Sequence, residues 1–296
     1  MPLSQSGTVR PLSKGVQAMD QPTGTLNKTD ALARRYGDAD LPMAGPWNDT
    51  IDLLLAHQSI RAFRPDPLPA GTLETLAAAA QSAATSSNMQ MWSMIAVTDP
   101  ATKSAIAKAS QNQKHIEQCP LFIAFIADVS RNQRVGARAA TALPALDHFE
   151  SFLVAAIDAA LAAQNAVIAA ESLGLGTVYI GAMRNQPQFI AELLGLPPGA
   201  MGVFGLCVGY ADPAKASDVK PRLPQQAVLF HGRYGIDAEG ALISAYDQDM
   251  GAFSKRHEMS DDTWTGRVIN RQRDIKNLNG REKLVDILHA MGFALK

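Results

Sequence analysis

Two patterns of hydrophobic and polar positions alternate along this chain, one with the spacing of a helix and one of short apolar runs. Apolar residues at helical spacing predict helices over residues 49–56, 68–82, 100–109, 186–194, 238–254 and 281–291. Short apolar runs between them predict buried strands near residues 94–98, 121–127, 177–181 and 202–209. The alternation predicts an α+β fold in which a mixed central sheet is sandwiched by helices.

The longest apolar run, residues 152–175, is long enough to suggest a membrane span. Asp158 and Glu171 interrupt it, and an isolated acid in the middle of a bilayer costs roughly 3 kcal/mol. A buried core helix that ends at Gly174 fits the sequence better. Its many alanines allow another helix to approach closely, which suits a subunit interface.

The first 45 residues differ from the rest of the chain. They are rich in Ser, Thr, Gly, Pro and Gln, so residues 1–45 are expected to form a flexible or surface-wrapping arm, in which Met19 is a second candidate start. The arm has no hydrophobic signal core, which predicts a cytoplasmic protein. Residues 46–232 are expected to form the core, and residues 233–296 a helical C-terminal excursion continuous with it.

Composition narrows the classes of function. With 296 residues, 47% hydrophobic content and a net charge of −1, the chain can bury a sizeable core and is not a basic nucleic-acid binder. Cys119 and Cys207 both lie in apolar runs and are expected to be reduced core residues of an intracellular protein. The six histidines show no metal-ligand spacing, so no metal site is expected.

Two basic clusters are the main chemical signal. His57, Ser59 and Arg61 directly follow the first predicted helix, and Lys220 and Arg222 lie more than 150 residues downstream. Arginine pairs bidentately with a phosphate or with the edge of a heterocycle, lysine adds a point charge, and serine donates at short range. The clusters predict one anionic ligand held from both sides, and the alternative is two solvated surface patches.

A polar loop and a glycine add candidate contacts for a flat ligand. The loop 83–93 contains Asn88 and Gln90, whose amides match the mixed donors and acceptors of a heterocycle, although its serines equally suit a helix-terminal turn. The apolar run near residue 180 predicts a strand that ends at Gly181, where a backbone can approach a ring closely.

Seven short motifs follow one another along the chain. They are His-x-Ser-x-Arg at 57–61, Ser-Ser-Asn-x-Gln-x-Trp at 86–92, Gln-Lys-His at 113–115, Ala-Gln-Asn-Ala-x-Ile-Ala-Ala-Glu-Ser-Leu-Gly-Leu-Gly at 163–176, Tyr-Ile-Gly at 179–181, Phe-Gly-Leu-Cys-x-Gly at 204–209 and Lys-Pro-Arg-Leu-Pro at 220–224. In this order they resemble the flavin-dependent nitroreductases, and within them the larger oxygen-insensitive NADPH type. The resemblance covers roughly residues 48–296.

The resemblance implies FMN as the cofactor and NADPH or NADH as the co-substrate. It also implies a homodimer that reduces nitroaromatics, quinones and flavins by ping-pong, two-electron hydride transfer. The implied phosphate contacts are His57, Ser59, Lys220 and Arg222, beside Gln58. The implied ring or ribityl contacts are Ser86, Ser87, Asn88, Gln90 and Gln113. The backbone implied to face N5 of the ring is that of Tyr179, Ile180, Gly181 and Ala182.

Other basic residues acquire roles by the same resemblance. Arg61 is implied to lie by the N1 and C2 carbonyl edge of the flavin, where a fixed cation favours hydride acceptance. Arg184 is implied to bind substrate or nicotinamide, and Lys255 and Arg256 to meet the 2′-phosphate of NADPH. Residues 259–261 lack the further basic side chains expected there, which leaves the choice between NADPH and NADH open. The family often has a second arginine at the position of the uncharged Gln58, so one phosphate cation is missing.

Alternatives remain within and outside this reading. A classical dinucleotide fold fits poorly, because Gly174, Gly176 and Gly181 have the wrong spacing and the glycine run precedes a strand. An NAD(P)H:flavin or quinone reductase with incidental nitroreductase activity fits the same motifs. A flavin-binding protein without turnover also fits them, and NAD(P)H oxidation would separate it from an enzyme.

Overall fold

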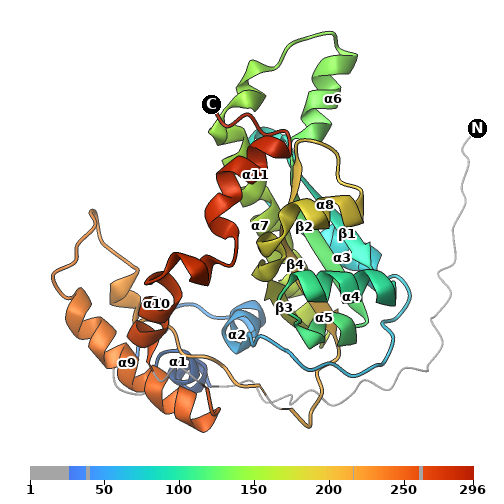
Figure 1. The fold of residues 1–296 in the computed structure, drawn as a ribbon. Helices are drawn as coiled ribbons and strands as arrows, with labels where there is room; N and C mark the ends of the chain where they lie inside the picture. Colours follow the sequence, from blue (N-terminus) through green and yellow to red (C-terminus); the bar gives the residue numbers. More distant parts are fainter. Residues whose placement is uncertain (1–26, 38–40, 216, 260–262) are drawn as a thin grey trace, which may run out of the picture.

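The computed structural model describes residues 27–37, 41–215, 217–259 and 263–296. Its centre is a four-stranded sheet in the order β1-β2-β4-β3, with every neighbouring pair antiparallel (Figure 1). The strands are β1 (Trp92–Val97), β2 (Leu121–Asp128), β3 (Gly176–Ile180) and β4 (Ala200–Gly209). Each predicted strand is confirmed within two residues at either end.

The predicted α+β class is confirmed, but the pairing within the sheet differs from the mixed arrangement expected. Parallel pairing enters only outside the named strands of the described residues, through an isolated bridge between Ser59 and Thr177. There the chain after α2 (Asp49–Ala56) runs beside the edge strand β3, and the amide of Ile60 donates to the carbonyl of Thr177 at 2.8 Å. The segment that carries the first basic cluster is therefore attached to the sheet edge.

Strand β2 shows why helices cover both faces of the sheet. All of its residues are buried, and alternate side chains of a strand point to opposite faces. Phe122, Ala124 and Ile126 pack toward α4 (Pro100–Ala109), α5 (Lys114–Gln118) and α8 (Pro187–Leu194). Leu121, Ile123 and Phe125 pack toward α3 (Thr72–Gln81) and α7 (Phe149–Ser172). The predicted sandwich is confirmed.

Helix α7 is the long apolar helix expected from the sequence. By length and composition it could cross a membrane, and it is the one such helix among the described residues. Its alanine-rich side is buried against the sheet and α3, at Ala159, Ala162, Ala163, Ala166 and Ala170. Gly174, at φ +77°, follows the end of the helix as predicted. These contacts make α7 a core helix of this fold.

Several helices were not predicted. They are α1 (Lys28–Tyr36), α5, α6 (Ser130–Arg138) and α10 (Trp264–Gln272). Helix α1 lies in the segment expected to be a flexible arm, yet Asn27 caps it and Ala31 and Leu32 are buried. Its sequence is too polar for the apolar pattern to stand out, which is why composition missed it. The rest of the arm up to residue 26, with Met19, lies outside the described residues.

The C-terminal segment forms α9 (Glu239–Arg256), α10 and α11 (Leu284–Ala290). Figure 1 shows α9 and α10 beside α1, away from the sheet, and α11 returning toward the far end of α7. Leu288 and Phe293 are buried there with Ala155 of α7.

The two cysteines are free and buried, as expected, and their thiols form a hydrogen bond with each other. Burial raises the pKa of the Cys207 thiol.

Candidate functional site

The two basic clusters lie on the wall of one cleft. The cleft has a volume of about 350 Å³, within the range of roughly 300–1,000 Å³ for small-molecule sites. Its walls come from the segment after α2, from residues 215 and 217–222, and from the end of α9. The lining residues are His57, Gln58, Ser59, Arg61, Ala62, Lys215, Ser217, Asp218, Lys220, Arg222, Phe253, His257 and Met259. The structure thus brings together residues that are more than 150 positions apart in sequence.

Glu171, near the end of α7, fixes the first cluster from behind. Its carboxylate lies 2.7 Å from Nδ1 of His57 and accepts a hydrogen bond from Thr177 at 2.9 Å. With Nδ1 engaged, Nε2 is the ring nitrogen left for a ligand. Gly176 lets this segment lie close to β3, because a Cβ at Gly176 would come within 2.6 Å of the Ile60 side chain.

Positive charge accumulates in the cleft. The pKa of Lys220 is lowered, first by burial and then by the neighbouring charges of Arg267, Arg61 and Arg222. Among the described residues that line the cleft, the one carboxylate is Asp218, and it is engaged by Arg256 at 3.9 Å and by His257 at 3.2 Å. Cations that lower one another's pKa favour an anion between them, so the cleft is suited to a phosphate group.

Arg61 lies close to the predicted Gln-Lys-His segment. The pKa of His115 is lowered by burial and by the charge of Arg61, which shows that the two side chains are near each other. Nε2 of His115 is buried and has no hydrogen-bond partner in the part of the chain that the structure describes. Gln113 precedes α5, after Gln111 and Asn112 with positive φ values of 64° and 56°. Such strained turns occur where a binding side chain must be placed.

The predicted contacts near residue 180 lie along β3, beyond the bridge of Ser59 to Thr177. Tyr179 donates a hydrogen bond to Gln164 at 3.3 Å, and its pKa is raised by burial and by Glu171. Ile180 is buried and Ala182 nearly so, which leaves their backbone as the part able to meet a ligand. At Gly181 the nearest atom to an added Cβ is Nη2 of Arg184, 3.4 Å away.

Arg184 belongs to a second group of cations. Burial and the charge of Arg271 lower the pKa of Arg184, while burial, Arg184 and Arg271 lower that of Arg281. Arg281 also donates to the side chain of Asn185 at 2.8 Å. Sequence reasoning missed Arg271 and Arg281, because they come from the C-terminal excursion and no local pattern sets them apart.

The loop with Ser86, Ser87, Asn88 and Gln90 does not lie at the cleft. The carboxylate of Asp158 holds it by accepting hydrogen bonds from the Thr85 hydroxyl at 2.6 Å and from the amides of Ser86, at 3.2 Å, and Met91, at 3.1 Å. Asp158 is thirteen residues before Glu171 in α7, a separation of roughly 20 Å along a helix. Within one chain the loop and the two basic clusters therefore lie at different places, and the implied contact of this loop with the ligand stays a prediction.

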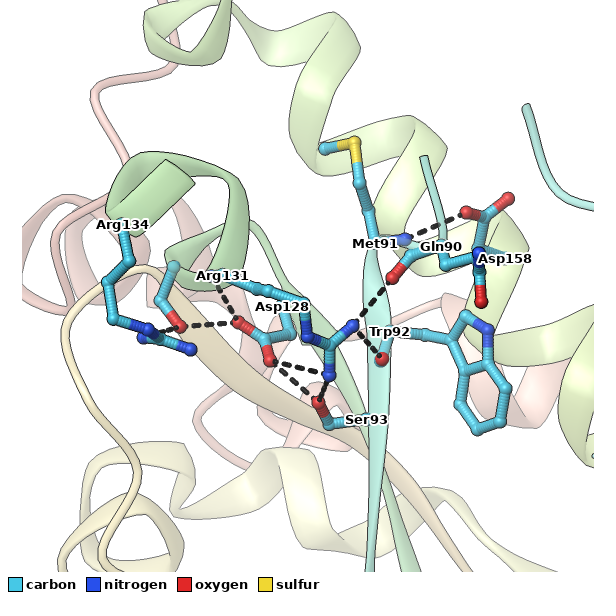
Figure 2. A network of polar contacts seen from close by, with 9 residues as sticks. Gln90, Met91, Trp92, Ser93, Asp128, Arg131, Arg134 and Asp158 are labelled. Atoms are coloured by element: carbon cyan, nitrogen blue, oxygen red, sulfur yellow. Dashed lines mark hydrogen bonds and ion pairs between the residues drawn. The ribbon is translucent and has the colours of Figure 1, made fainter. Parts of the chain in front are cut away.

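A polar network holds this loop in a strained form (Figure 2). Ser87, Asn88 and Gln90 have φ values of 49°, 55° and 50°, which non-glycine residues rarely adopt. Arg131 of α6 donates to the carbonyls of Gln90, at 2.8 Å, and Trp92, at 3.1 Å. Such strain persists where the surroundings over-determine it, as in binding loops. No local sequence pattern predicts that Asp158 and Arg131 anchor this loop.

The residues expected at the 2′-phosphate do not line the cleft. Lys255 is exposed, and Arg256 points toward Asp218 and lies over the ring of Phe253. Arg256 lines a smaller pocket on the other side of the 218–221 segment, which Arg34 also lines. His257 and Met259 occupy the cleft side instead. Residues 260 and 261 lie outside the described part of the chain.

Comparison with known proteins decides the family. The Nitroreductase family profile matches residues 54–210, and the profile for the C-terminal domain of that family matches residues 220–296. The chain belongs to the nitroreductase family. The two profiles together cover the sheet, the cleft segments and the C-terminal helices.

Individual relatives agree with this membership. The chain is 38% identical to FMN reductase (NADPH) of Bacillus subtilis, over 75% of this chain and 91% of that protein. It is 36% identical to the oxygen-insensitive NADPH nitroreductase of Salmonella typhimurium, over 83% of this chain and 99% of that protein. Among solved structures, the NfrA1 nitroreductase of B. subtilis is 36% identical with a TM-score of 0.78, over 84% of this chain and 100% of that one.

The nitroreductase match leaves a part of this chain uncovered. Three solved relatives, from B. subtilis, Bacillus megaterium and Vibrio parahaemolyticus, are matched over their full length by only 83–85% of this chain. Because the two family matches begin at residue 54 and end at residue 296, most of the uncovered part precedes residue 54. Helix α1 lies there.

Proposed function

We infer that this chain is an FMN-dependent NAD(P)H oxidoreductase that reduces small electron acceptors such as nitroaromatics, quinones and flavins. The observation that supports this is the cationic cleft beside β3, in which Arg61, Lys220 and Arg222 line one space with Asp218, which is already engaged by His257. The names of the relatives support it, since they include an FMN reductase and a nitroreductase that use NADPH.

The residues of the cleft fit a flavin mononucleotide. Burial, followed by the neighbouring charges of Arg267, Arg61 and Arg222, lowers the pKa of Lys220, and a bound phosphate would offset both effects. His57, Ser59, Lys220 and Arg222 would hold this phosphate, with Gln58 beside them. Arg61, next to the unpartnered Nε2 of His115, would hold a polar edge of the ring.

When bound, FMN accepts a hydride from NAD(P)H and passes it to the acceptor. Arg61 keeps a fixed positive charge where negative charge would develop, which stabilises the reduced cofactor more than the oxidised one. Gly181 exposes backbone without a side chain, which leaves room for a flat ring. Arg184, close to Arg271 and Arg281, provides positive charge for an anionic substrate or for the nicotinamide dinucleotide. No side chain needs to act as a nucleophile.

The preference between NADPH and NADH remains a separate proposal. Lys255 and Arg256 would set any preference for NADPH, as the resemblance implies. For this role Arg256 would have to leave Asp218. The two side chains are 3.9 Å apart, a long ion pair, and 61% of the Arg256 side chain is exposed. Such an exposed pair contributes little free energy and can be replaced by a phosphate contact.

We further propose that the enzyme is a homodimer with its flavin sites between the two copies. Helix α7 exposes Phe149, Leu153, Ile157 and Leu161, which recur every four residues and so form one apolar stripe, each 41–51% exposed. The strained loop around Asn88 does not line the cleft of its own chain. A second copy on this stripe would cover the apolar side chains and could supply its own loop to the first copy's cleft.

A cytoplasmic location completes the proposal. NAD(P)H is a cytoplasmic reductant, and the free, buried Cys119 and Cys207 suit a reducing compartment.

Purification with and without added FMN tests the function. We expect a yellow protein with flavin absorbance that oxidises NADPH or NADH when a nitroaromatic, a quinone, chromate or free FMN is present. Protein that stays colourless after FMN is added would contradict the proposal. Protein that binds FMN but oxidises neither nicotinamide would instead indicate a flavin-binding protein without turnover. The panel of acceptors would also show whether nitroaromatics or flavins and quinones are the better substrates.

A further inference from the structure

Arg35 on α1 is almost fully buried, with 5% of its surface exposed. Its Nη1 donates a hydrogen bond to the carbonyl oxygen of Lys220 at 2.9 Å. Its Nη2 donates to the carbonyl oxygens of Leu55, at 2.5 Å, and His57, at 3.0 Å. One guanidinium therefore joins the end of α2 to the segment around Lys220. These are the two segments whose side chains line the cleft.

The contact is reciprocal and completes the end of α2. The amide of Arg222 donates to the carbonyl of Arg35 at 2.8 Å. Helix α2 has no basic residue in its last turn, and the last carbonyls of a helix have no partner within the helix and favour a nearby cation. Arg35 supplies both the donors and the charge. The distance between the two basic clusters thus depends on Arg35, which contacts their backbone and not the side chains that line the cleft.

Arg35 also adds charge behind the wall of the cleft. Among the described residues no carboxylate forms an ion pair with it, and Glu171 offsets only part of its charge from a distance. Burial and the nearby Arg222 lower the pKa of Arg35. A buried cation without a counterion is costly. An anion bound in the cleft would therefore interact favourably with Arg35 as well as with Arg222 and Lys220.

We propose that Arg35 is a positioning residue for the phosphate half of the cleft, and that α1 is a buttress that sets the distance between the two cationic segments. The proposal rests on the proposed binding of FMN. Helix α1 lies before residue 54, where the family match begins, so the buttress lies outside the part of the chain that the family profiles cover. It also places a cation near the position of the uncharged Gln58.

Binding of two flavins to the full-length apoprotein tests this role. Riboflavin has the ring of FMN but no phosphate, so it reports on the ring site alone. The variants are Arg35→Gln, Arg35→Lys and the control Arg34→Gln, which removes the same charge from the exposed neighbour on the same helix. Fluorescence titration gives Kd for each flavin, and the apoprotein Tm shows that each variant is folded.

We expect Arg35→Gln to weaken FMN by about three- to tenfold, less than the loss of a direct charge-assisted contact, and to leave riboflavin within about twofold of wild type. Arg35→Lys should lie between, because lysine keeps the charge but lacks the planar fork that reaches three carbonyls. Arg34→Gln should bind both flavins as wild type does. If Arg35→Gln does not fold, the same FMN-to-riboflavin comparison is read from Arg35→Lys.

Two results would overturn the proposal. Equal weakening of FMN and riboflavin would show that Arg35 only maintains the fold, and unchanged FMN binding would show that it has no role at the cleft. A wild-type protein that binds neither flavin would refute the proposed function, and this inference with it. If wild type and Arg35→Gln both bind FMN tightly and equally well, only the role of Arg35 is refuted, and the proposed function stands.

Discussion

The imidazole of His57 and the carboxylate of Glu171 lie 2.7 Å apart, although 114 positions separate them in sequence. This pair connects the end of the long core helix to the first basic cluster of the cleft. Because Glu171 also accepts a hydrogen bond from Thr177 of β3, one side chain holds His57 against both the helix and the sheet edge. The orientation of His57 is thus a property of the core and not of the surface loop.

Glu171→Gln should weaken FMN binding. The amide lacks the charge that orients His57 through Nδ1, and losing a hydrogen bond to a charged group costs about 1.5–3 kcal/mol. Since the side chain does not touch the ligand, we expect a smaller effect of about three- to tenfold in Kd. Thr177→Val is the control, because it removes the hydroxyl contact and leaves the His57 pair in place. Equal Kd values for Glu171→Gln and wild type would contradict this role of Glu171.

Arg222→Ala should weaken FMN by about tenfold or more, because a charge-assisted contact to phosphate is worth roughly 1.5–3 kcal/mol. Arg138→Ala, at the exposed end of α6, is a control for the loss of one positive charge. Fluorescence titration measures both variants. Unchanged affinity for Arg222→Ala would remove this residue from the phosphate site.

Arg61→Ala should affect flavin reduction more than FMN binding. The interaction that is lost strengthens as negative charge develops during hydride transfer, so the rate constant falls more than the affinity does. Stopped-flow loss of flavin absorbance after mixing with NADPH gives the rate at saturating FMN. Arg222→Ala should show the opposite pattern, with a larger change in Kd than in rate. A variant at position 61 with normal reduction kinetics would place Arg61 away from the reacting edge.

FMN affinity should decrease at alkaline pH. Burial and three neighbouring arginines lower the pKa of Lys220 below its usual 10.5, whereas a bound phosphate favours the charged form. FMN binding is therefore coupled to proton uptake by Lys220, and it weakens as the pH rises through the lowered pKa of the free protein. The folding stability of the apoprotein should change with pH in the opposite direction. The unfolded chain holds the Lys220 proton more tightly than the folded protein does, so the contribution of Lys220 to stability rises as the pH increases from the lowered pKa to 10.5.

Lys220→Arg provides the matched control for this pH dependence. Arginine stays protonated throughout, so the variant should show a flatter profile of Kd against pH than wild type. Titrations of both proteins with the same FMN stock cancel the ionisation of the flavin itself. Identical profiles would show that Lys220 does not titrate in this range.

Ile157→Glu should produce a monomer. It places a charge in the middle of the exposed apolar stripe on α7, where a second copy would have to desolvate it. Multi-angle light scattering should give about 31.6 kDa for the variant and twice that mass for wild type. Arg138→Glu changes an exposed residue at the end of α6, outside α7, and should remain dimeric. A wild-type protein that runs as an FMN-loaded monomer would contradict the proposed dimer.

The sequence predicted the elements of the core better than the contacts between them. Strands such as β2 and the helix α7 carry their signal locally, because burial on both faces demands unbroken apolar runs. The sequence also predicted that Arg61 and Arg222 lie at one site, because two separate basic clusters can hold one anionic ligand from both sides. Helix α1 was missed because only three of its residues are buried, one of them Arg35.

The distance between the cleft and the loop around Asn88 shows a different limit. The motif predicts a ligand contact but does not indicate which copy of the chain provides it. Asp158 decides the position of the loop, and its role depends on packing between α7 and the end of η1 (Ser86–Asn88), which no local pattern encodes. Arg271 and Arg281 were missed for the same reason.

Helix α7 carries Glu171 near one end and Asp158 nearer the other, each holding a different group of binding residues. In the proposed dimer the two groups serve different ligands, because Glu171 supports the cleft of its own chain and Asp158 supports the loop offered to the partner. A rigid helix transmits a displacement along its axis to both ends. Occupation of one site would therefore alter the geometry of the other, and the two active sites would be expected to respond to ligand as a coupled pair.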